Sequence, residues 1–314
     1  MEGLSEINTI PQEIIEFAKS EGQKAIPQIA KNPQIFLKIE NIIKKYPTEH
    51  LFFNKDSRIM DDIPNSSVHL IVTSPPYWTL KEYPESEGQL GFIEDYDEFL
   101  LELDKVWKNI FRILVPGGRL VIIVGDVCIP RRRYGRHTVV PLHASIQEHC
   151  RRIGFDNLAP IIWYKIANAK MEASRSTSFL GKPYEPNAII KNDIEYILFQ
   201  RKSGGYRHPS LETRILSIIP QDAYRIYFNQ IWQDIKGASC RDHPAPYPIE
   251  LAERLIRMFS FVGDTVLDPF SGTGSTAIAA AKWGRNSINF EIDNSFFNFA
   301  IKQFEKNNSQ LKLE

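Results

Sequence analysis

The sequence predicts an α/β protein built on a mostly parallel sheet. From Leu51 onward, short apolar runs rich in β-branched residues alternate with stretches of helical periodicity, as in parallel strands joined by crossover helices. In the last third, a strand over 265–267 leads into a glycine-rich turn over 268–275 and an alanine-rich helix over 276–283. A strand over 287–290 then ends on Glu291. This order is typical of a domain that binds a nucleotide-like ligand at the carboxyl edge of its sheet.

The other elements follow from apolar periodicity and from the breaks between them. The strands are predicted over 51–53, 68–72, 119–124, 158–164 and 194–199, and the helices over 96–114 and 247–261. The helix over 96–114 has apolar residues at helical spacing and stops before Pro116-Gly117-Gly118. The first 50 residues predict short helices punctuated by prolines, of which Pro11 fits the first turn of a helix.

The length of 314 residues suits one large domain. We expect residues 1–50 to form a helical arm, and 51–126 and 236–314 to form the two parts of one core. Residues 127–235 are expected to supply the remaining core strands together with basic loops that recognise a target. No repeat or low-complexity segment interrupts this arrangement.

Composition excludes several classes of protein. No apolar run reaches the roughly 18–20 residues of a membrane span, and the first residues lack the basic and apolar regions of a signal peptide. Three widely spaced cysteines, with no CxxC pair, predict neither a zinc site nor a disulfide framework. We therefore expect a soluble cytoplasmic protein without a metal.

The charge is balanced over the chain but unevenly distributed. Residues 127–225 carry 16 Lys and Arg against 8 Asp and Glu, and the remainder carries 22 against 30. A basic middle section is what a nucleic-acid backbone would meet, whereas a merely solvated basic face is the alternative.

The glycine-rich turn predicts a ligand site. Gly272-Thr273-Gly274-Ser275-Thr276-Ala277 matches the loose pattern GxGxxA, in which glycines let the backbone approach a ligand at a helix N-terminus. Glu291 lies 23 residues after Asp268, at the end of the adjoining strand, where a carboxylate can accept from ribose hydroxyls. By itself the pattern fits NAD, FAD or S-adenosylmethionine.

A second motif follows the strand over 68–72. Thr73-Ser74-Pro75-Pro76-Tyr77-Trp78 places two prolines before aromatic residues, which restricts the turn to few conformations. The prolines have no N–H, so the nearby carbonyls, with the Ser74 hydroxyl, form a rim of hydrogen-bond acceptors beside the flat ring of Tyr77. Such a rim suits a substrate amino group.

Together, this motif and the string Asp268-Pro269-Phe270-Ser271-Gly272-Thr273-Gly274 resemble those of the β group of DNA amino-methyltransferases, a family of restriction–modification enzymes. The resemblance covers about residues 51–304. It implies the Rossmann-like methyltransferase fold, circularly permuted so that the catalytic motif precedes the cofactor loop, with an inserted DNA-recognition region. In that fold the strands ending at Val72 and Leu267 are expected to be neighbours at the topological switch point, with both loops at the same carboxyl edge of the sheet. The implied cofactor is S-adenosylmethionine, with S-adenosylhomocysteine as product and no metal.

The resemblance also implies roles for particular residues. The site of methyl transfer is formed by Ser74, Pro75, Pro76 and Tyr77, with Tyr77 and Trp78 as candidates for stacking on a flipped base. In the cofactor loop (Asp268, Pro269, Phe270, Ser271, Gly272, Thr273 and Gly274), Phe270 packs beside the cofactor and Asp268 is the expected partner of its ammonium group. Asp56 fits the acidic residue that lies near the cofactor adenine in the family, although the residues around Asp56 match the family pattern less well.

Ser at the first motif position is typical of enzymes that methylate N4 of cytosine, whereas Asp or Asn is typical of N6-adenine enzymes. We therefore expect N4 of cytosine in double-stranded DNA, with N6 of adenine as the alternative. The residues expected to contact DNA are Arg131, Arg132, Arg133, Arg136, Arg175 and Lys182. A restriction endonuclease acting on the same site is a possible partner, and both monomer and dimer stay open.

Two further hypotheses remain. A nicotinamide-dependent oxidoreductase would use the loop at Gly272 but leaves Ser74-Pro75-Pro76-Tyr77 unexplained. A DNA-binding protein that has lost catalysis is disfavoured because both motifs are intact.

Overall fold

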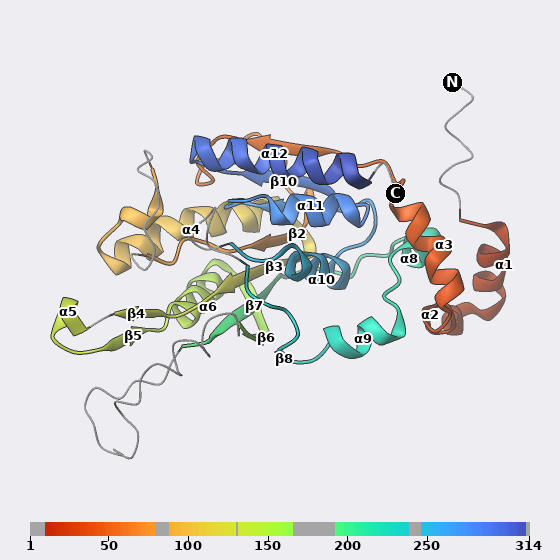
Figure 1. Cartoon of the computed structure of the whole chain (residues 1–314), viewed down its shortest axis with the longest axis horizontal. Helices are drawn as coiled ribbons and strands as arrows, with labels where there is room; N and C mark the ends of the chain where they lie inside the picture. Colours follow the sequence, from red (N-terminus) through yellow and green to blue (C-terminus); the bar gives the residue numbers. More distant parts are fainter. Residues whose placement is uncertain (1–9, 79–87, 130, 166–191, 239–245, 312–314) are drawn as a thin grey trace, which may run out of the picture.

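The fold is known from a computed structural model, which describes residues 10–78, 88–129, 131–165, 192–238 and 246–311, with only the backbone at 133, 134 and 309–311. Its centre is an eight-stranded sheet in the order β1-β10-β9-β2-β3-β7-β6-β8 (Figure 1).

Five neighbouring strands of the sheet are parallel. They are β1 (His50–Phe53), β10 (Asn286–Phe290), β9 (Thr265–Asp268), β2 (Val68–Thr73) and β3 (Leu114–Val124). Beyond β3, strand β7 (Ile194–Lys202) runs antiparallel, β6 (Phe155–Tyr164) is antiparallel to β7, and the short β8 (Ile231–Trp232) is parallel to β6. The predicted mostly parallel sheet is therefore confirmed.

Strand β2 lies between β9 and β3, which brings two distant loops together. In the register, Leu70 pairs with Val266 and Ile71 with Leu267. Because these strands are parallel, the loops that follow Thr73 and Asp268 leave the sheet at the same edge. The sequence predicted this neighbourhood, and the strand pairing confirms it.

Alternation along β2 produces the two faces of the sheet. Leu70 and Val72 join the apolar cluster beneath α10 (Ile249–Phe259) and α11 (Ser275–Lys282), whereas Ile71 joins the cluster beneath α4 (Tyr96–Ile113) and α6 (Leu142–Ile153). The last helix, α12 (Asn294–Leu311), packs on α11 and β1. The result is a sheet covered by helices on both sides (Figure 1).

Helix α4 shows how local sequence produces an element. The Asp95 side chain caps it by accepting from the Glu98 N–H at 2.8 Å. Its apolar positions at helical spacing, such as Phe99, Val106 and Trp107, are fully buried. The helix gives way directly to β3, which begins at Leu114, five residues before the predicted start.

The N-terminal helices form a smaller apolar cluster of their own. They are α1 (Gln12–Glu21), α2 (Ala25–Ala30) and α3 (Pro33–Ile43), with a 3-10 turn over Gly22–Lys24. Pro11 is the N-cap residue of α1, and Pro33 begins α3 behind the Asn32 cap. Their buried isoleucines pack with Ile215 and Leu216 of α8 (Leu211–Leu216). Figure 1 shows this group at one end of the molecule.

A hairpin that the sequence did not predict extends from the carboxyl edge of β3. Strands β4 (Val127–Ile129) and β5 (Thr138–Val140) pair antiparallel, and α5 (Arg131–Tyr134) lies between them in the chain. The remaining short helices are the 3-10 helix η3 (Leu90–Phe92) and α9 (Gln221–Tyr227). Among the described helices, none has the length and apolar character to cross a membrane.

Candidate active site

A cleft of about 610 Å³ opens at the carboxyl edge of β9, β2 and β10. It brings together segments that are up to about 240 residues apart in the chain. The predicted site residues among its lining are Asp56, Ser74, Pro76, Pro269, Phe270 and Glu291. They are joined by Lys55, Ser57, Gly88, Gln89, Leu90, Ile292 and Phe296, which the sequence did not single out.

The loop after β2 presents a hydroxyl to this cleft. Ser74 is partly exposed and lines the cleft, and its Oγ donates to the Tyr77 hydroxyl oxygen at 3.3 Å. Pro75 and Pro76 between them are buried and have no N–H to donate. Ser74 and Pro76 line the cleft at the edge of the sheet, whereas Pro75 is not among the lining residues.

The two aromatic residues of the motif lie deeper than expected for base stacking. Trp78 has φ +45°, its indole N–H donates to the Ile93 carbonyl at 2.9 Å, and its ring meets Tyr96 edge-on. Only 5% of Trp78 and 5% of Tyr77 is exposed. This places Trp78 as an anchor of the loop in the core, and the burial of both rings does not support the expected stacking of Tyr77 or Trp78 on a base.

The glycine turn after β9 requires its glycines. Gly272 has φ +49° and Gly274 has φ +80°, a region that other residues rarely adopt. A Cβ on Gly274 would also come within 3.3 Å of the Ala300 Cβ on α12. The Gly274 N–H closes the turn on the Ser271 carbonyl at 2.8 Å, and α11 begins directly afterwards. Glycine therefore lets the turn fold tightly against α12, and neither Gly272 nor Gly274 is among the residues that line the cleft.

Glu291 ties this turn to the end of β10. Its Oε2 accepts from the Gly272 N–H at 2.8 Å and its Oε1 accepts from the Asp293 N–H at 3.0 Å. Burial raises the pKa of Glu291 to about 7, while the two backbone N–H groups act in the opposite direction. Each oxygen keeps a second lone pair, so the carboxylate can still accept from a pair of ligand hydroxyls.

Asp56 follows β1 and faces the same cleft. Its carboxylate pairs with the Arg58 guanidinium, with Nη2–Oδ2 at 2.6 Å, and also accepts from the Arg58 backbone N–H at 2.8 Å. Arg58 in turn reaches Glu102 at 2.5 Å and the Gly88 carbonyl at 3.1 Å. The ion pair fixes the orientation of Asp56 toward the cleft.

Asp268 is placed differently from the sequence prediction. It is fully buried, and it does not line the cleft. Its Oδ1 accepts from the Thr73 hydroxyl at 2.7 Å and the Phe270 N–H at 3.0 Å, and its Oδ2 accepts from the Tyr247 hydroxyl at 2.7 Å. Its position therefore does not support direct contact with a cofactor ammonium group. Asp268 joins the two loops of the site from beneath.

Tyr247 and Thr276 complete this buried network. The Tyr247 hydroxyl contacts the Thr276 hydroxyl, which donates to the Val72 carbonyl at 3.2 Å. Ser275 Oγ donates to the Tyr247 carbonyl at 2.9 Å. Burial and the Asp268 charge raise the pKa of Tyr247 well above its usual value, so the phenol keeps its proton. The network connects the ends of β2 and β9 with the segment before α10.

Two residues of the predicted cofactor loop turn away from the cleft. Ser271 is buried, and its Oγ has no hydrogen-bond partner among the described residues. Thr273 lines a separate hollow with Pro246 and Phe299.

The comparisons with known proteins agree with this geometry. A family model described as DNA methylase, of the N6/N4 type, matches residues 68–303. The type II methyltransferase M.MjaI of Methanocaldococcus jannaschii is 37% identical over 278 residues, which are 79% of this chain and 88% of that protein. The chain belongs to the N6/N4 family of DNA methylases. This membership argues against the oxidoreductase hypothesis.

Other relatives of the methylase support the same family assignment. The type II methyltransferase M.MthZI of Methanothermobacter thermautotrophicus is 36% identical over 275 residues, covering 79% of this chain and 74% of that protein. Among solved structures, a candidate DNA modification methylase of Thermus thermophilus, complexed with S-adenosyl-L-methionine, is 52% identical, with a TM-score of 0.68 over 83% of this chain and 96% of that one. The cytosine-N4-specific PvuII DNA methyltransferase is 18% identical, with a TM-score of 0.60 over 85% and 93% of the two chains, and shares the fold.

The methylase carries further charged groups beside the Ser74 loop, where β3, β6 and β7 meet this edge. Asp126 Oδ1 lies 2.6 Å from His143 Nδ1, and the imidazole stacks on the Tyr196 ring at 3.7 Å between centroids. Lys165 Nζ donates to Glu195 Oε1 at 2.8 Å. Gly125, directly after β3, lies between these groups and the motif, because a Cβ there would lie 3.5 Å from Glu195 Cγ and 3.7 Å from Tyr77 Cε2.

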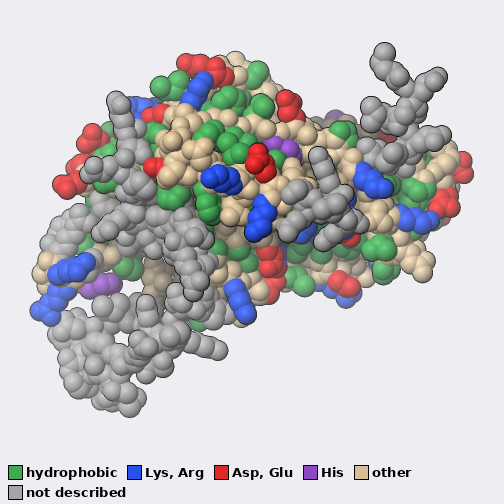
Figure 2. Space-filling view, turned by 45° about the horizontal axis from the view of Figure 1, so that its top comes forward, with side chains coloured by type: hydrophobic (Ala, Val, Ile, Leu, Met, Phe, Trp, Pro, Cys, Tyr) green, Lys and Arg blue, Asp and Glu red, His purple; other side chains and the backbone are tan. Residues whose placement is uncertain are grey.

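Arginines cluster on the hairpin of the methylase. Arg131, Arg132 and Arg136 are exposed on or just after α5, and Arg131 Nε donates to the Gly135 carbonyl at 3.2 Å. In Figure 2, Lys and Arg side chains gather at the end of the molecule where Figure 1 places α5. The Arg133 side chain, Arg175 and Lys182 lie outside the described residues. Among the described residues, no group of three or more His, Cys, Asp or Glu is arranged to hold a metal.

Proposed function

We propose that the methylase transfers a methyl group from S-adenosylmethionine to N4 of a flipped cytosine in double-stranded DNA. The observation that carries the proposal is that Ser74 of the acceptor loop and Glu291 of the ligand loop line one cleft. The order of the two motifs in the chain, with the acceptor loop first, supports the proposed circular permutation of the methyltransferase fold.

The residues of the cleft fit the cofactor. Glu291 keeps two free lone pairs for the ribose hydroxyls. Asp56 lines the same cleft and is assigned to the adenine end, with both of its oxygens held by Arg58. Phe270, Ile292 and Phe296 provide apolar surface for the flat adenine ring. When bound, S-adenosylmethionine supplies an electrophilic methyl group on a sulfonium. The related Thermus structure that contains S-adenosyl-L-methionine supports this assignment.

Ser74 and Pro75 activate the substrate amino group. An exocyclic amino nitrogen is a poor nucleophile because its lone pair is delocalised into the ring. Hydrogen bonds from its two N–H groups to the Ser74 hydroxyl and the Pro75 carbonyl draw the nitrogen toward tetrahedral geometry and localise the lone pair. The nitrogen then forms the bond to the methyl carbon as the carbon–sulfur bond breaks, and an amino proton leaves. Catalysis rests mainly on positioning.

The Ser74 hydroxyl also favours cytosine over adenine as the target. A neutral hydroxyl accepts one N–H of the amino group, whereas the acidic or amide residue expected at this position of an adenine enzyme would offer a different acceptor. N6 of adenine is the second candidate, and the family includes enzymes of both kinds.

DNA is expected to lie along the carboxyl edge, where the arginine-bearing hairpin projects. Arg131, Arg132 and Arg136 are exposed and suit phosphate or guanine contacts, and the target base has to leave the duplex to reach Ser74. We assign target recognition to residues 127–235. The type II relatives support a role in protecting host DNA beside an endonuclease of the same specificity.

The test is methyl transfer itself. Purified protein is incubated with S-adenosylmethionine labelled in its methyl group and with DNA from a host without methyltransferases. We expect label to enter the DNA. We expect no transfer when the protein has been denatured by heat before the incubation. Absence of transfer to DNA with diverse sequence would contradict the proposal.

A further inference from the structure

Two arginines face each other at the opposite, amino edge of the sheet. Arg119 of β3 pairs in register with Arg201 of β7, and Arg201 pairs with Asp156 of β6. The Arg201 guanidinium donates to Asp156 Oδ2, from Nη2 at 2.8 Å and from Nε at 3.1 Å. Like charges directly opposite on neighbouring strands are unfavourable, and here, among the described residues, the Asp156 carboxylate pairs with Arg201 alone.

Arg119 is the arginine left without a counterion. Among the described residues no carboxylate lies within ion-pair distance of it, and its buried Nε has no hydrogen-bond partner. Its guanidinium lies over the Phe259 ring, 5.6 Å from the centroid. Burial, and then the Arg201 charge, lower the pKa of Arg119, but a guanidinium stays protonated in proteins. The Arg119 side chain is half-buried and carries a charge that no described carboxylate balances, and a bound anion would balance it.

An open pocket of about 1020 Å³ lies beside this pair. Its walls include Arg119, Arg201 and Arg207, together with the glycine turns at Gly117 and Gly204. The turns touch through backbone, because a Cβ on Gly117 would lie 2.8 Å from the Gly205 carbonyl oxygen. Glycine at position 117 therefore allows the two turns to pack against each other at this wall.

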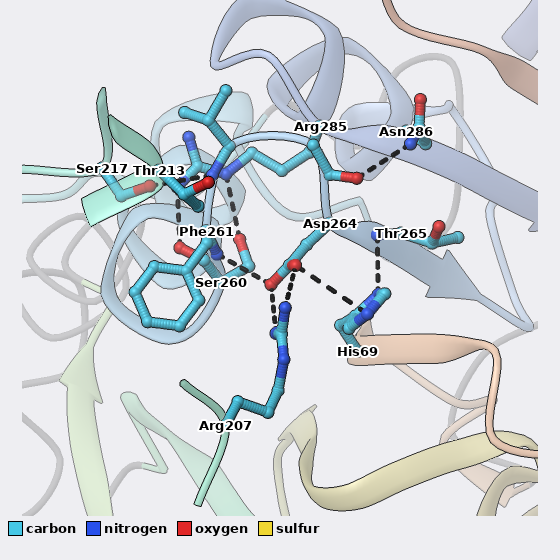
Figure 3. Close-up of polar contacts among 12 residues, drawn as sticks. His69, Arg207, Thr213, Ser217, Ser260, Phe261, Asp264, Thr265, Arg285 and Asn286 are labelled. Carbon is cyan, nitrogen blue, oxygen red and sulfur yellow. Dashed lines mark hydrogen bonds and ion pairs between the residues drawn. The ribbon is translucent and has the colours of Figure 1, made fainter. Parts of the chain in front are cut away.

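The third arginine and a histidine complete the lining, and Figure 3 shows both beside Asp264. Arg207 binds the Asp264 carboxylate with both terminal nitrogens, at 2.6 and 2.5 Å. His69 Nδ1 accepts from the Thr265 N–H at 3.0 Å, which leaves the proton of the neutral ring on Nε2. Three arginines against Asp156 and Asp264 leave one positive charge in excess.

We propose that this pocket binds a phosphate group, with Arg119 as its principal ligand. The fork of guanidinium donors matches the oxygens of phosphate. The site is separate from the catalytic cleft, because Arg119 lies five residues before Val124, the carboxyl end of β3, or roughly 17 Å along the strand. The phosphate is either free, as inorganic phosphate or a mononucleotide, or part of a DNA backbone.

The test compares phosphate with chloride at equal ionic strength. We expect phosphate to raise the thermal unfolding midpoint of the wild-type protein and to give a saturable isotherm by calorimetry. Arg119→Gln is expected to raise the phosphate dissociation constant at least about tenfold, because it removes a charged donor. Arg151→Gln serves as the matched control, since Arg151 is an exposed arginine on α6 that pairs with Glu148.

Several outcomes decide the matter. No saturable phosphate binding by the wild type overturns the proposal, whether or not the variant folds, and so does an Arg119→Gln variant that binds phosphate as the wild type does. Two further arms identify the source. If the phosphate is free, Arg119→Gln loses binding of inorganic phosphate or of a mononucleotide but keeps the wild-type affinity for duplex DNA. If it belongs to DNA, the variant also binds the duplex more weakly, and inorganic phosphate competes with the duplex.

Discussion

Replacing Glu291 with glutamine tests the ligand half of the site. The carboxylate is held by the Gly272 and Asp293 N–H groups and lines the cleft, so two lone pairs remain for the ribose. Glutamine keeps the size but turns one oxygen into an NH₂ group, which removes one acceptor and the charge. A hydrogen bond to a charged group contributes about 1.5–3 kcal/mol, so we expect the dissociation constant for S-adenosylmethionine to rise about 10–150-fold.

The assay is isothermal titration calorimetry with S-adenosylmethionine, carried out well above pH 7. This pH keeps the wild-type carboxylate ionised, because burial raises the pKa of Glu291 to about 7. Glu305→Gln is the matched control, since Glu305 is an exposed residue of α12 away from the cleft. A folded Glu291→Gln protein with the wild-type dissociation constant would refute the assignment of Glu291 to the ribose.

Four other predictions concern different parts of the molecule. If the ionised form of Glu291 is the one that binds, the dissociation constant of the wild type should rise as the pH falls through about 7, and it should change much less in Glu291→Gln. Ser74→Ala should reduce the single-turnover rate of methyl transfer about 10²-fold or more while the cofactor dissociation constant stays near that of the wild type; a wild-type rate would exclude Ser74 from activation. Asp268→Asn should lower the free energy of unfolding by about 1–3 kcal/mol in denaturant titrations, because the Phe270 N–H and two hydroxyls lose a charged acceptor. In a wild-type background, Arg132→Gln with Arg136→Gln should reduce the slope of log affinity for DNA against log salt by about 1–2, and an unchanged slope would remove the hairpin from the phosphate footprint.

The sequence predicted the parts of the structure that depend on local pattern. Apolar spacing was sufficient for α4, and the string around Gly272 and Gly274 was sufficient for the turn, because the positive φ angles there allow few residues. The neighbourhood of β2 and β9 followed from the rule that ligand sites form where the strand order reverses.

The burial of Asp268 and its hydrogen-bond partners could not be predicted in the same way. Its partners Thr73 and Tyr247 lie 195 and 21 residues away in the chain, and only the packed structure shows that they use both carboxylate oxygens. Trp78 is a similar case, because the left-handed backbone that turns its ring into the core leaves no trace in the sequence. Long-range burial decides which polar residue of a motif meets a ligand and which one supports the loop.

The Arg119 site depends on register. Nothing in the local sequence places Arg119 opposite Arg201, and a shift of either strand by one residue would move one of them to the other face. Strand pairing is therefore the information that places Arg119 and Arg201 in one candidate site.

The measurement that tests the central claim most directly is the identity of the methylated nucleoside. DNA methylated by the purified protein is digested to nucleosides, and the products are separated and identified by mass against standards. We predict N4-methylcytosine, with its amount strongly reduced for Ser74→Ala. N6-methyladenine would contradict the assignment of the target base, and the absence of any methylated nucleoside would contradict the function itself.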